Sequence, residues 1–497
     1  MFKDLSSRQI SKVIICVLFV VTIFFATYQL TESPSFWYDE GWYFQSATNL
    51  AESGVFGLQL APGNIMHISM YQTVSYPLIY PLALWMKVFG ISVLSGRALM
   101  AVFILALIIA SYFLVKRIFS NITALGSMAL LATFAPLYGN GKSILGEVPG
   151  LLYFILFLLF LNLVISTKDK KTVWIILSGI FAGLCISTKP FFILLAPAII
   201  VGIIVGWKRG DISKKSILIG VLSFCMPIIA WFFIQFQSGD SVFQVFSYYA
   251  NPYAFEDPNY HKSILTVVMQ SINALFTNIS TIYTVILISL WVFAISIKVY
   301  IKEKINIEEI IAFIFSITIM VSYLRIGGIF RYFFPAQILI LVFLPNTLRV
   351  INNFIFDRSR YLNIFKYYEK SIPVIAIVLL SLFGLYQLMF NSWVAEAYGS
   401  HKTEFWQEYF SKTSTTTSVF FYDTPEVAPF IQSKNYYQSI LTTRINTIGK
   451  EQLSHLKSGT IDMVIVETSK YDPQKDTVFG NYILDQTAYK YSILKHR

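Results

Sequence analysis

Two neighbouring carboxylates, Asp39 and Glu40, lie in an aromatic-rich stretch shortly after the first long apolar run of the chain. A carboxylate among aromatic rings at a membrane surface is in a dry environment, which suits a general base. Carboxylates are also favoured at helix N-termini, so the pair could equally cap a helix that begins near Gly41. The residues alone leave both interpretations open.

A second acid and a second base occur together in the stretch YGNGKSILGEVPG, which contains Lys142 and Glu147. This stretch separates two apolar runs. The two side chains could form a functional acid–base pair at the mouth of a helix bundle, or a solvated loop pair with no further role.

Four more basic residues lie in or beside tight turns between apolar runs. Lys189, in CISTKPFF, has almost no loop around it, so its ammonium must extend to the membrane surface or bind an anion. Arg325 and Arg331 flank one tight turn, and Arg97 opens another apolar run. If these cations share one face of the membrane with Asp39, they form an electropositive pocket that holds a base. Phosphate is the anion that such pockets usually bind.

The composition indicates which class of protein must position these side chains. Of the 497 residues, 56% are hydrophobic and only 13% are charged, whereas a soluble domain has about 25% charged residues. A soluble enzyme is therefore excluded, and 44 Phe and 30 Tyr exclude a disordered chain. The net charge of +11 does not indicate a nucleic-acid partner, because residues 392–497 carry 11 basic and 11 acidic residues and the whole excess lies in the apolar part.

Eleven apolar runs are long enough to predict transmembrane helices. They cover residues 12–30, 97–115, 122–139, 148–166, 173–188, 190–207, 216–236, 279–298, 309–324, 331–348 and 372–391. An odd number of spans puts the two ends of the chain on opposite sides of the membrane.

The basic residues orient this polytopic α-helical protein. With a cytoplasmic N-terminus, 20 of the 27 Lys and Arg residues before residue 392 lie on the cytoplasmic side, as the positive-inside rule requires. The loops 31–96 and 237–278 are then outside. We expect two helical pieces in the first loop, near 41–53 and 78–89, and the second of these to lie in the membrane interface. The sequence contains no GxxxxGK[ST] motif, which argues against an ATP-driven pump.

The last hundred residues have a different pattern, which predicts a small extracytoplasmic α/β domain over 392–497. Buried strands are expected at 417–423 and 461–467, and helices at 425–433 and 448–458. No binding motif stands out in this domain.

Five stretches, in order along residues 10–350, resemble the membrane glycosyltransferases of the GT-C superfamily. The resemblance is strongest to the branch that includes the protein O-mannosyltransferases and the lipid A aminoarabinose transferase. The stretches are WYDEGWYFQSATNLAESGVFG, YPLIYPLALWMKVFG with the Arg that opens the second span, GEVPG, GIFAGLCISTKP and GGIFRYFFPAQILILVF. Two departures stand out: Ser75-Tyr76 occupies the place where many relatives have Lys or His, and a luminal sugar-binding insert is absent. The second departure favours a prokaryotic enzyme.

The resemblance implies a transmembrane catalytic domain over 1–391 that moves a sugar from a polyprenyl-phosphate donor to an acceptor hydroxyl on the outer face of the plasma membrane. Asp39 is then the base, and one base without a separate nucleophile implies inversion at the anomeric carbon. The implied phosphate-binding residues are Arg97, Lys189 and Arg331. The implied supporting charged residues are Glu40, Glu147, Lys142 and Arg325.

No cofactor is obligatory for this chemistry. A lipid phosphate is a good leaving group, so a divalent metal would help without being required, and the sequence has no DxD pair to hold one. The expected partners are the lipid-linked donor, membrane lipid and an acceptor that is a glycan, a lipid or a protein, and not nucleic acid. The alternative function is a transporter or flippase for an anionic lipid-linked substrate, which would have similar hydropathy and buried charges. A structural membrane subunit is a third interpretation, but it leaves Asp39 and Arg97 unexplained.

Overall fold

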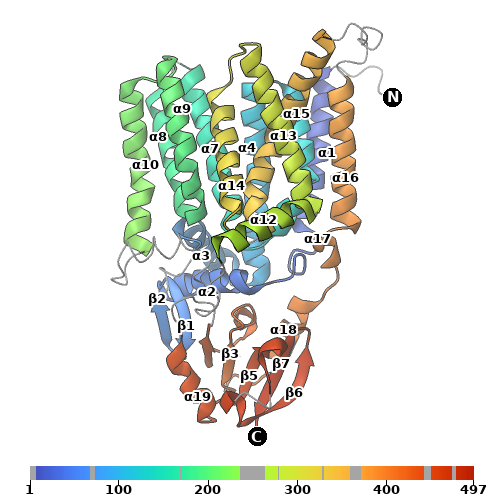
Figure 1. Ribbon diagram of the computed structural model, residues 1–497. Helices are drawn as coiled ribbons and strands as arrows, with labels where there is room; N and C mark the ends of the chain where they lie inside the picture. The colour runs from blue at the N-terminus through green and yellow to red at the C-terminus, as the bar shows by residue number, and fades with distance from the viewer. Residues whose placement is uncertain are drawn as a thin grey trace.

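The computed structural model describes residues 7–67, 73–167, 171–235, 263–277, 279–326, 329–358, 371–440, 449–472 and 477–497. Long helices form a bundle, a five-stranded sheet lies beyond one end of it, and the elements of the first loop lie between the two (Figure 1). The first helix begins at the end of the bundle that faces away from the sheet. The predicted class, a polytopic helical membrane protein with a small C-terminal α/β domain, is confirmed.

Each predicted span corresponds to a helix or a pair of helices. The bundle contains α1 (Ser7–Thr27), α4 (Val93–Ile118), α5 (Asn121–Ala132), α6 (Ala135–Lys142), α7 (Glu147–Ser166), α8 (Lys171–Thr188), η2 (Pro190–Leu195) continuing as α9 (Ala196–Lys208), α10 (Lys214–Gln235), α13 (Ile279–Tyr300), α14 (Ile307–Tyr323), η3 (Phe330–Phe333) continuing as α15 (Phe334–Arg358), and α16 (Ser371–Phe390). Among the described residues, nine helices are long and apolar enough to cross a membrane, or ten if the bent pair α5–α6 counts as one span. The remaining predicted span corresponds to α14, which has 17 residues and stands within the bundle.

The prediction of one continuous span over 122–139 is wrong. The chain bends by 63° between α5 and α6. Phe134 at the break is extended, and Pro136 lies in the first turn of α6, where a proline is tolerated because its missing N–H would have no partner there. After the bend, α6 ends at Lys142, whose Nζ donates to the Tyr28 carbonyl just after α1.

The first loop contains the two helical pieces that the sequence predicts. They are α2 (Tyr38–Ser53) and α3 (Tyr76–Phe89). Gly54 ends α2 with φ of +75°, a conformation that glycine adopts without strain. Between the helices lies a hairpin that sequence analysis missed, β1 (Gly57–Ala61) paired with β2 (Asn64–His67).

The second predicted outside loop is described only in its last part, as α12 (Ile264–Thr277). This helix crosses the end of the bundle instead of running parallel to it (Figure 1). The earlier part of that predicted loop, residues 237–262, lies outside the described residues.

The C-terminal region forms a mixed sheet with strand order β4-β3-β5-β7-β6. Its elements are α17 (Trp393–Glu396), α18 (Lys402–Ser411), β3 (Val419–Tyr422), η5 (Ala428–Phe430), β4 (Tyr436–Ser439), η6 (Lys450–Gln452), α19 (Leu453–Lys457), β5 (Met463–Glu467), η7 (Thr468–Lys470), η8 (Thr477–Phe479), β6 (Tyr482–Ala488) and β7 (Tyr491–His496). Both predicted strands are present as β3 and β5, which run parallel. The predicted helix over 425–433 is wrong: only the single turn η5 forms, since Pro425 and Pro429 remove backbone donors.

Alternation along the strands gives the sheet two apolar faces. Phe421, Ile465 and Ile493 belong to the large core that continues into the helix bundle, whereas Phe420 and Val464 belong to a second core with α19. The C-terminal sheet is therefore packed onto the elements of the first loop. The predicted domain boundary at 391/392 stays a prediction.

Candidate active site

Helix α2 positions both members of the acidic pair. Trp37 is extended, the helix begins at Tyr38, and Asp39 and Glu40 lie in its first turn, where the helix dipole favours a negative charge. Neighbouring helical residues point about 100° apart, because a turn holds 3.6 residues. The two carboxylates therefore reach different partners.

Asp39 begins a chain of four alternating charges. Its Oδ2 lies 2.9 Å from Nη1 of Arg331, and Nε of the same guanidinium lies 3.6 Å from Oε1 of Glu147. That Glu147 oxygen also accepts a hydrogen bond from Nζ of Lys189 at 2.5 Å. We call Asp39, Arg331, Glu147 and Lys189 the ion chain. Its members come from four segments: α2, η3, the start of α7 and the residue before η2.

The ion chain is open at one end and buried at the other. The side chains of Asp39 and Arg331 are 31% and 20% exposed, whereas those of Glu147 and Lys189 are 4% and 5% exposed. Two buried atoms of the ion chain, Glu147 Oε2 and Arg331 Nε, have no hydrogen-bond partner. Buried polar atoms are normally paired, so these two atoms have capacity left for a ligand.

Sequence analysis missed two groups beside the ion chain. The Trp37 ring lies 4.8 Å from the guanidinium carbon of Arg331, within cation–π range. The Tyr43 hydroxyl, one helical turn after Asp39, lies 2.5 Å from Oγ1 of Thr73. Burial, with a further effect from the negative charge of Asp39, raises the pKa of Tyr43 well above its usual value, so its hydroxyl stays protonated. The aromatic composition of the segment was the available signal for Trp37 and Tyr43, and nothing in the sequence pointed to Thr73.

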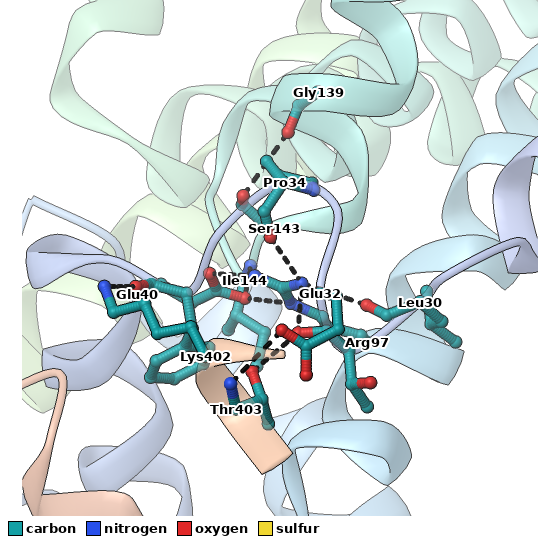
Figure 2. Close-up of polar contacts among 12 residues, drawn as sticks. Leu30, Glu32, Pro34, Glu40, Arg97, Gly139, Ser143, Ile144, Lys402 and Thr403 are labelled. Carbon is teal, nitrogen blue, oxygen red and sulfur yellow. Dashed lines mark hydrogen bonds and ion pairs between the residues drawn. The ribbon is translucent and has the colours of Figure 1, made fainter. Parts of the chain in front are cut away.

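Arg97 is not part of the ion chain. Its guanidinium forms a bidentate pair with Glu40, with both N–O distances 2.7 Å and both side chains 0% exposed (Figure 2). Nη1 donates to three carbonyl oxygens of the segment between α1 and α2, those of Leu30, Thr31 and Pro34. The Glu40 carboxylate also accepts from the backbone N–H of Ile144. We call this the buried pair. It closes the first loop onto the bundle, and it offers no open face to a ligand.

The other two predicted supporting residues also lie apart from the ion chain. Lys142 is buried, but its Nζ donates to the Tyr28 carbonyl at 2.9 Å and is not paired with Glu147. Arg325 is exposed in the turn that follows α14. The structure thus joins four of the eight predicted site residues in the ion chain and two in the buried pair.

Within the described part of the chain, no group of three His, Cys, Asp or Glu side chains could hold a metal ion. The two carboxylates of the ion chain both contact the Arg331 cation. A metal bound between them would have to replace that guanidinium.

Residues 77–233 match the family model described as dolichyl-phosphate-mannose-protein mannosyltransferase, which confirms the resemblance seen in the sequence. A search of curated protein sequences finds no match for the chain.

Two solved structures have a similar fold along nearly the whole chain. One is ArnT from Cupriavidus metallidurans bound to undecaprenyl phosphate, with a TM-score of 0.58, 13% identity and 98% of each chain covered. The other is the archaeal oligosaccharyltransferase AglB from Archaeoglobus fulgidus, in complex with an inhibitory peptide and a dolichol-phosphate. It has a TM-score of 0.53 and 11% identity, and the match covers 93% of this chain and 70% of AglB.

Proposed function

We propose that the protein is an inverting glycosyltransferase that moves a sugar from a polyprenyl-phosphate donor to an acceptor hydroxyl on the outer face of the membrane. The ion chain is the observation that carries this proposal. It combines one accessible carboxylate with two cations at the end of the bundle where the first loop and the C-terminal sheet meet. Displacement at an anomeric carbon needs such a base, and it needs cations for the departing phosphate.

In this proposal, Arg331 and Lys189 bind the donor phosphate. A guanidinium matches phosphate geometry through two parallel hydrogen bonds, and the ammonium adds a point charge. Glu147 contacts both cations, so it holds them together before the donor arrives. Arg97 does not share this role, because Glu40 and three carbonyl groups already accept from its guanidinium.

Asp39 is the base of the proposed reaction. The acceptor oxygen forms its bond to the anomeric carbon, the bond from that carbon to the phosphate oxygen breaks, and the acceptor proton passes to the Asp39 carboxylate. In the structure, Asp39 is paired with Arg331. The donor phosphodiester, which carries one negative charge, would compete for the same guanidinium, so donor binding would release Asp39 for proton transfer.

The relatives support the donor class. ArnT was solved with undecaprenyl phosphate and AglB with a dolichol-phosphate, both of which are polyprenyl phosphates. The matched family model is also named for a dolichyl-phosphate-linked sugar.

The proposed orientation places the N-terminus in the cytoplasm and the C-terminal sheet outside. A reporter fused after Arg497 should therefore be active on the outer face, and a reporter fused within 359–370 should be active in the cytoplasm. Topology reporters of both kinds, one active only outside and one only inside, measure this directly. Finding both fusions on the same side would contradict the orientation and the outward-facing site.

The experiment for the function is transfer of labelled sugar from polyprenyl-phosphate donors by purified protein, with wild type compared with Asp39→Asn. Asparagine keeps the shape of aspartate but does not accept the proton. We expect transfer by wild type, donor binding by both proteins, and turnover lower by about 10²–10⁴ in the variant. Wild type that binds and moves the intact lipid-linked sugar without transferring it would favour the transporter alternative.

A further inference from the structure

A short segment of the C-terminal region, Asp423–Glu426, lies against the first turns of α2. It directly follows β3, whose neighbours β4 and β5 are both parallel to it, so it lies at the carboxyl edge of the parallel strands. The Asp423 N–H donates to the Ser439 carbonyl at 2.8 Å, which fixes the segment to the end of β4. We call these four residues the 423–426 segment.

One side-chain contact joins this segment to the residue next to the proposed base. The Tyr38 hydroxyl donates to Oδ1 of Asp423 at 2.6 Å, and Lys470 forms an ion pair with the other oxygen of Asp423. Asp423 is 5% exposed and has a φ of +53°, a left-handed conformation that costs free energy in a residue other than glycine. Such a conformation persists only where surrounding contacts impose it, and here it directs the carboxylate to Tyr38.

Two more contacts hold the same helix against the segment. Gln45 donates from Nε2 to the Pro425 carbonyl at 2.8 Å. Gly41 packs so closely that a Cβ atom there would lie 2.3 Å from Cα of Glu426. The approach is therefore possible only with glycine at position 41. The contacts of Tyr38, Gly41 and Gln45 with the 423–426 segment span the first two turns of α2. Asp39 lies between Tyr38 and Gly41 in the sequence.

From this geometry we infer that Asp423 is a positioning residue, which acts through Tyr38 to set the start of α2 and the place of Asp39 opposite Arg331. This inference rests on the proposed function, in which Asp39 is the base. It gives the C-terminal sheet a role in catalysis without contact with the substrate. Proton transfer depends steeply on geometry, and a displacement of about 1 Å can lower a rate about 100-fold.

The test uses the full-length protein with Tyr38→Phe, which removes the hydroxyl and keeps the ring. We expect kcat to fall about tenfold. A carboxylate displaced by a fraction of an ångström still reaches the geometry for proton transfer in a fraction of the molecules. The donor KM should stay near that of wild type, since Arg331 and Lys189 are unchanged. Tyr489→Phe is the matched control: its hydroxyl donates to the backbone carbonyl of Ser400, outside the 423–426 segment. This control should keep wild-type kcat.

A second background separates positioning from general loosening of the fold. In Asp39→Asn, the base is already lost, so adding Tyr38→Phe should change the residual turnover little. In an Asp423→Ala background, Tyr38→Phe should likewise lower kcat little further, because the hydrogen bond between the two side chains is already lost. Gly41→Ala should lower kcat through the same displacement, with an intact hydroxyl at Tyr38.

Three results would overturn the inference. One is wild-type kcat in Tyr38→Phe. Another is an equal loss in the wild-type and Asp39→Asn backgrounds, which would indicate a purely structural role. The third is normal turnover in Asp39→Asn, which would remove the proposed base as well. Impaired Asp39→Asn with normal Tyr38→Phe would leave the proposed function standing and reject the positioning role alone.

Discussion

Two arginine–carboxylate pairs start from consecutive residues of one helix and differ in nearly every physical respect. Glu40 and Arg97 have no exposed side-chain surface, and backbone groups of two other segments complete their hydrogen bonds. Asp39 and Arg331 are partly exposed, and Nε of Arg331 has no hydrogen-bond partner. The chemistry of the two pairs is the same, but only one has capacity left for a ligand.

The difference shows that the type of a charged residue does not define its role. A buried pair with every partner satisfied holds the structure together, and removing one member leaves the other charged in an apolar surrounding. A pair at an opening exchanges partners at little cost, because water and ligand can replace either group. The comparison assigns the buried pair to the architecture of the first loop and the ion chain to chemistry.

The largest effect is expected from Arg97→Ala. It leaves Glu40 buried without a counter-charge and leaves three carbonyl groups without their donor, so the free energy of unfolding should fall by about 3–5 kcal/mol. Thermal unfolding in detergent and the yield of folded protein measure this loss. Replacing both partners, as Arg97→Met with Glu40→Leu, should recover only part of the stability: no uncompensated charge remains, but the three carbonyl groups and the Ile144 N–H still lack partners. A fully stable Arg97→Ala protein with weak donor binding would move Arg97 into the phosphate site.

A smaller effect on the fold and a large effect on activity are expected from Arg331→Ala. Glu147 keeps its contact with Lys189, and Asp39 is solvated, so the midpoint of thermal unfolding should fall less than in Arg97→Ala. Turnover should fall about 10²–10³-fold, as when one group that stabilises a transition-state charge is removed. Arg331→Lys should recover only part of the activity, since an ammonium lacks the planar fork. Steady-state transfer assays at several donor concentrations give these values, and wild-type turnover in Arg331→Ala would exclude it as a phosphate ligand.

The smallest effect in the comparison is expected from Trp37→Phe. The substitution keeps an aromatic face over Arg331 and weakens its attraction for the cation by about 0.5–1 kcal/mol, or two- to fivefold in donor affinity. Competition by polyprenyl phosphate against labelled donor measures it. Phe36, whose ring lies 5.5 Å from the guanidinium carbon of Arg97 in the buried pair, offers the matched site. At this site, Phe36→Leu should lower the free energy of unfolding and leave the donor affinity unchanged.

The sequence was sufficient to predict the parts of the molecule that depend on local pattern. Apolar runs and basic loops predict the spans, and two short apolar strands predict β3 and β5. A proline in the first turn of α6 explains why one predicted span is broken, and this signal was present in the sequence. Asp39, Lys189 and Arg331 were selected as site residues by their type and their place between apolar runs.

What the sequence could not separate was the partner of each charge. Asp39 and Glu40 are adjacent in the sequence, but helical geometry points their side chains in different directions. Asp39 pairs with Arg331, 292 residues away, and Glu40 pairs with Arg97, 57 residues away. Lys142 is nearer to Glu147 in sequence than Lys189 is, and Lys189 is the residue that pairs with it. Such choices depend on the packing of the whole bundle. The contact between Tyr38 and Asp423, 385 residues apart, is of the same kind.

The central claim is that neighbouring residues of α2 divide chemistry and architecture between them. The most direct measurement compares Asp39→Asn and Glu40→Gln side by side for kcat per folded molecule and for the midpoint of thermal unfolding. We predict that Asp39→Asn lowers kcat by about 10²–10⁴ and leaves the midpoint unchanged. Glu40→Gln should lower the midpoint and leave kcat per folded molecule close to that of wild type. Wild-type turnover in Asp39→Asn, or lost turnover at an unchanged midpoint in Glu40→Gln, would contradict the division.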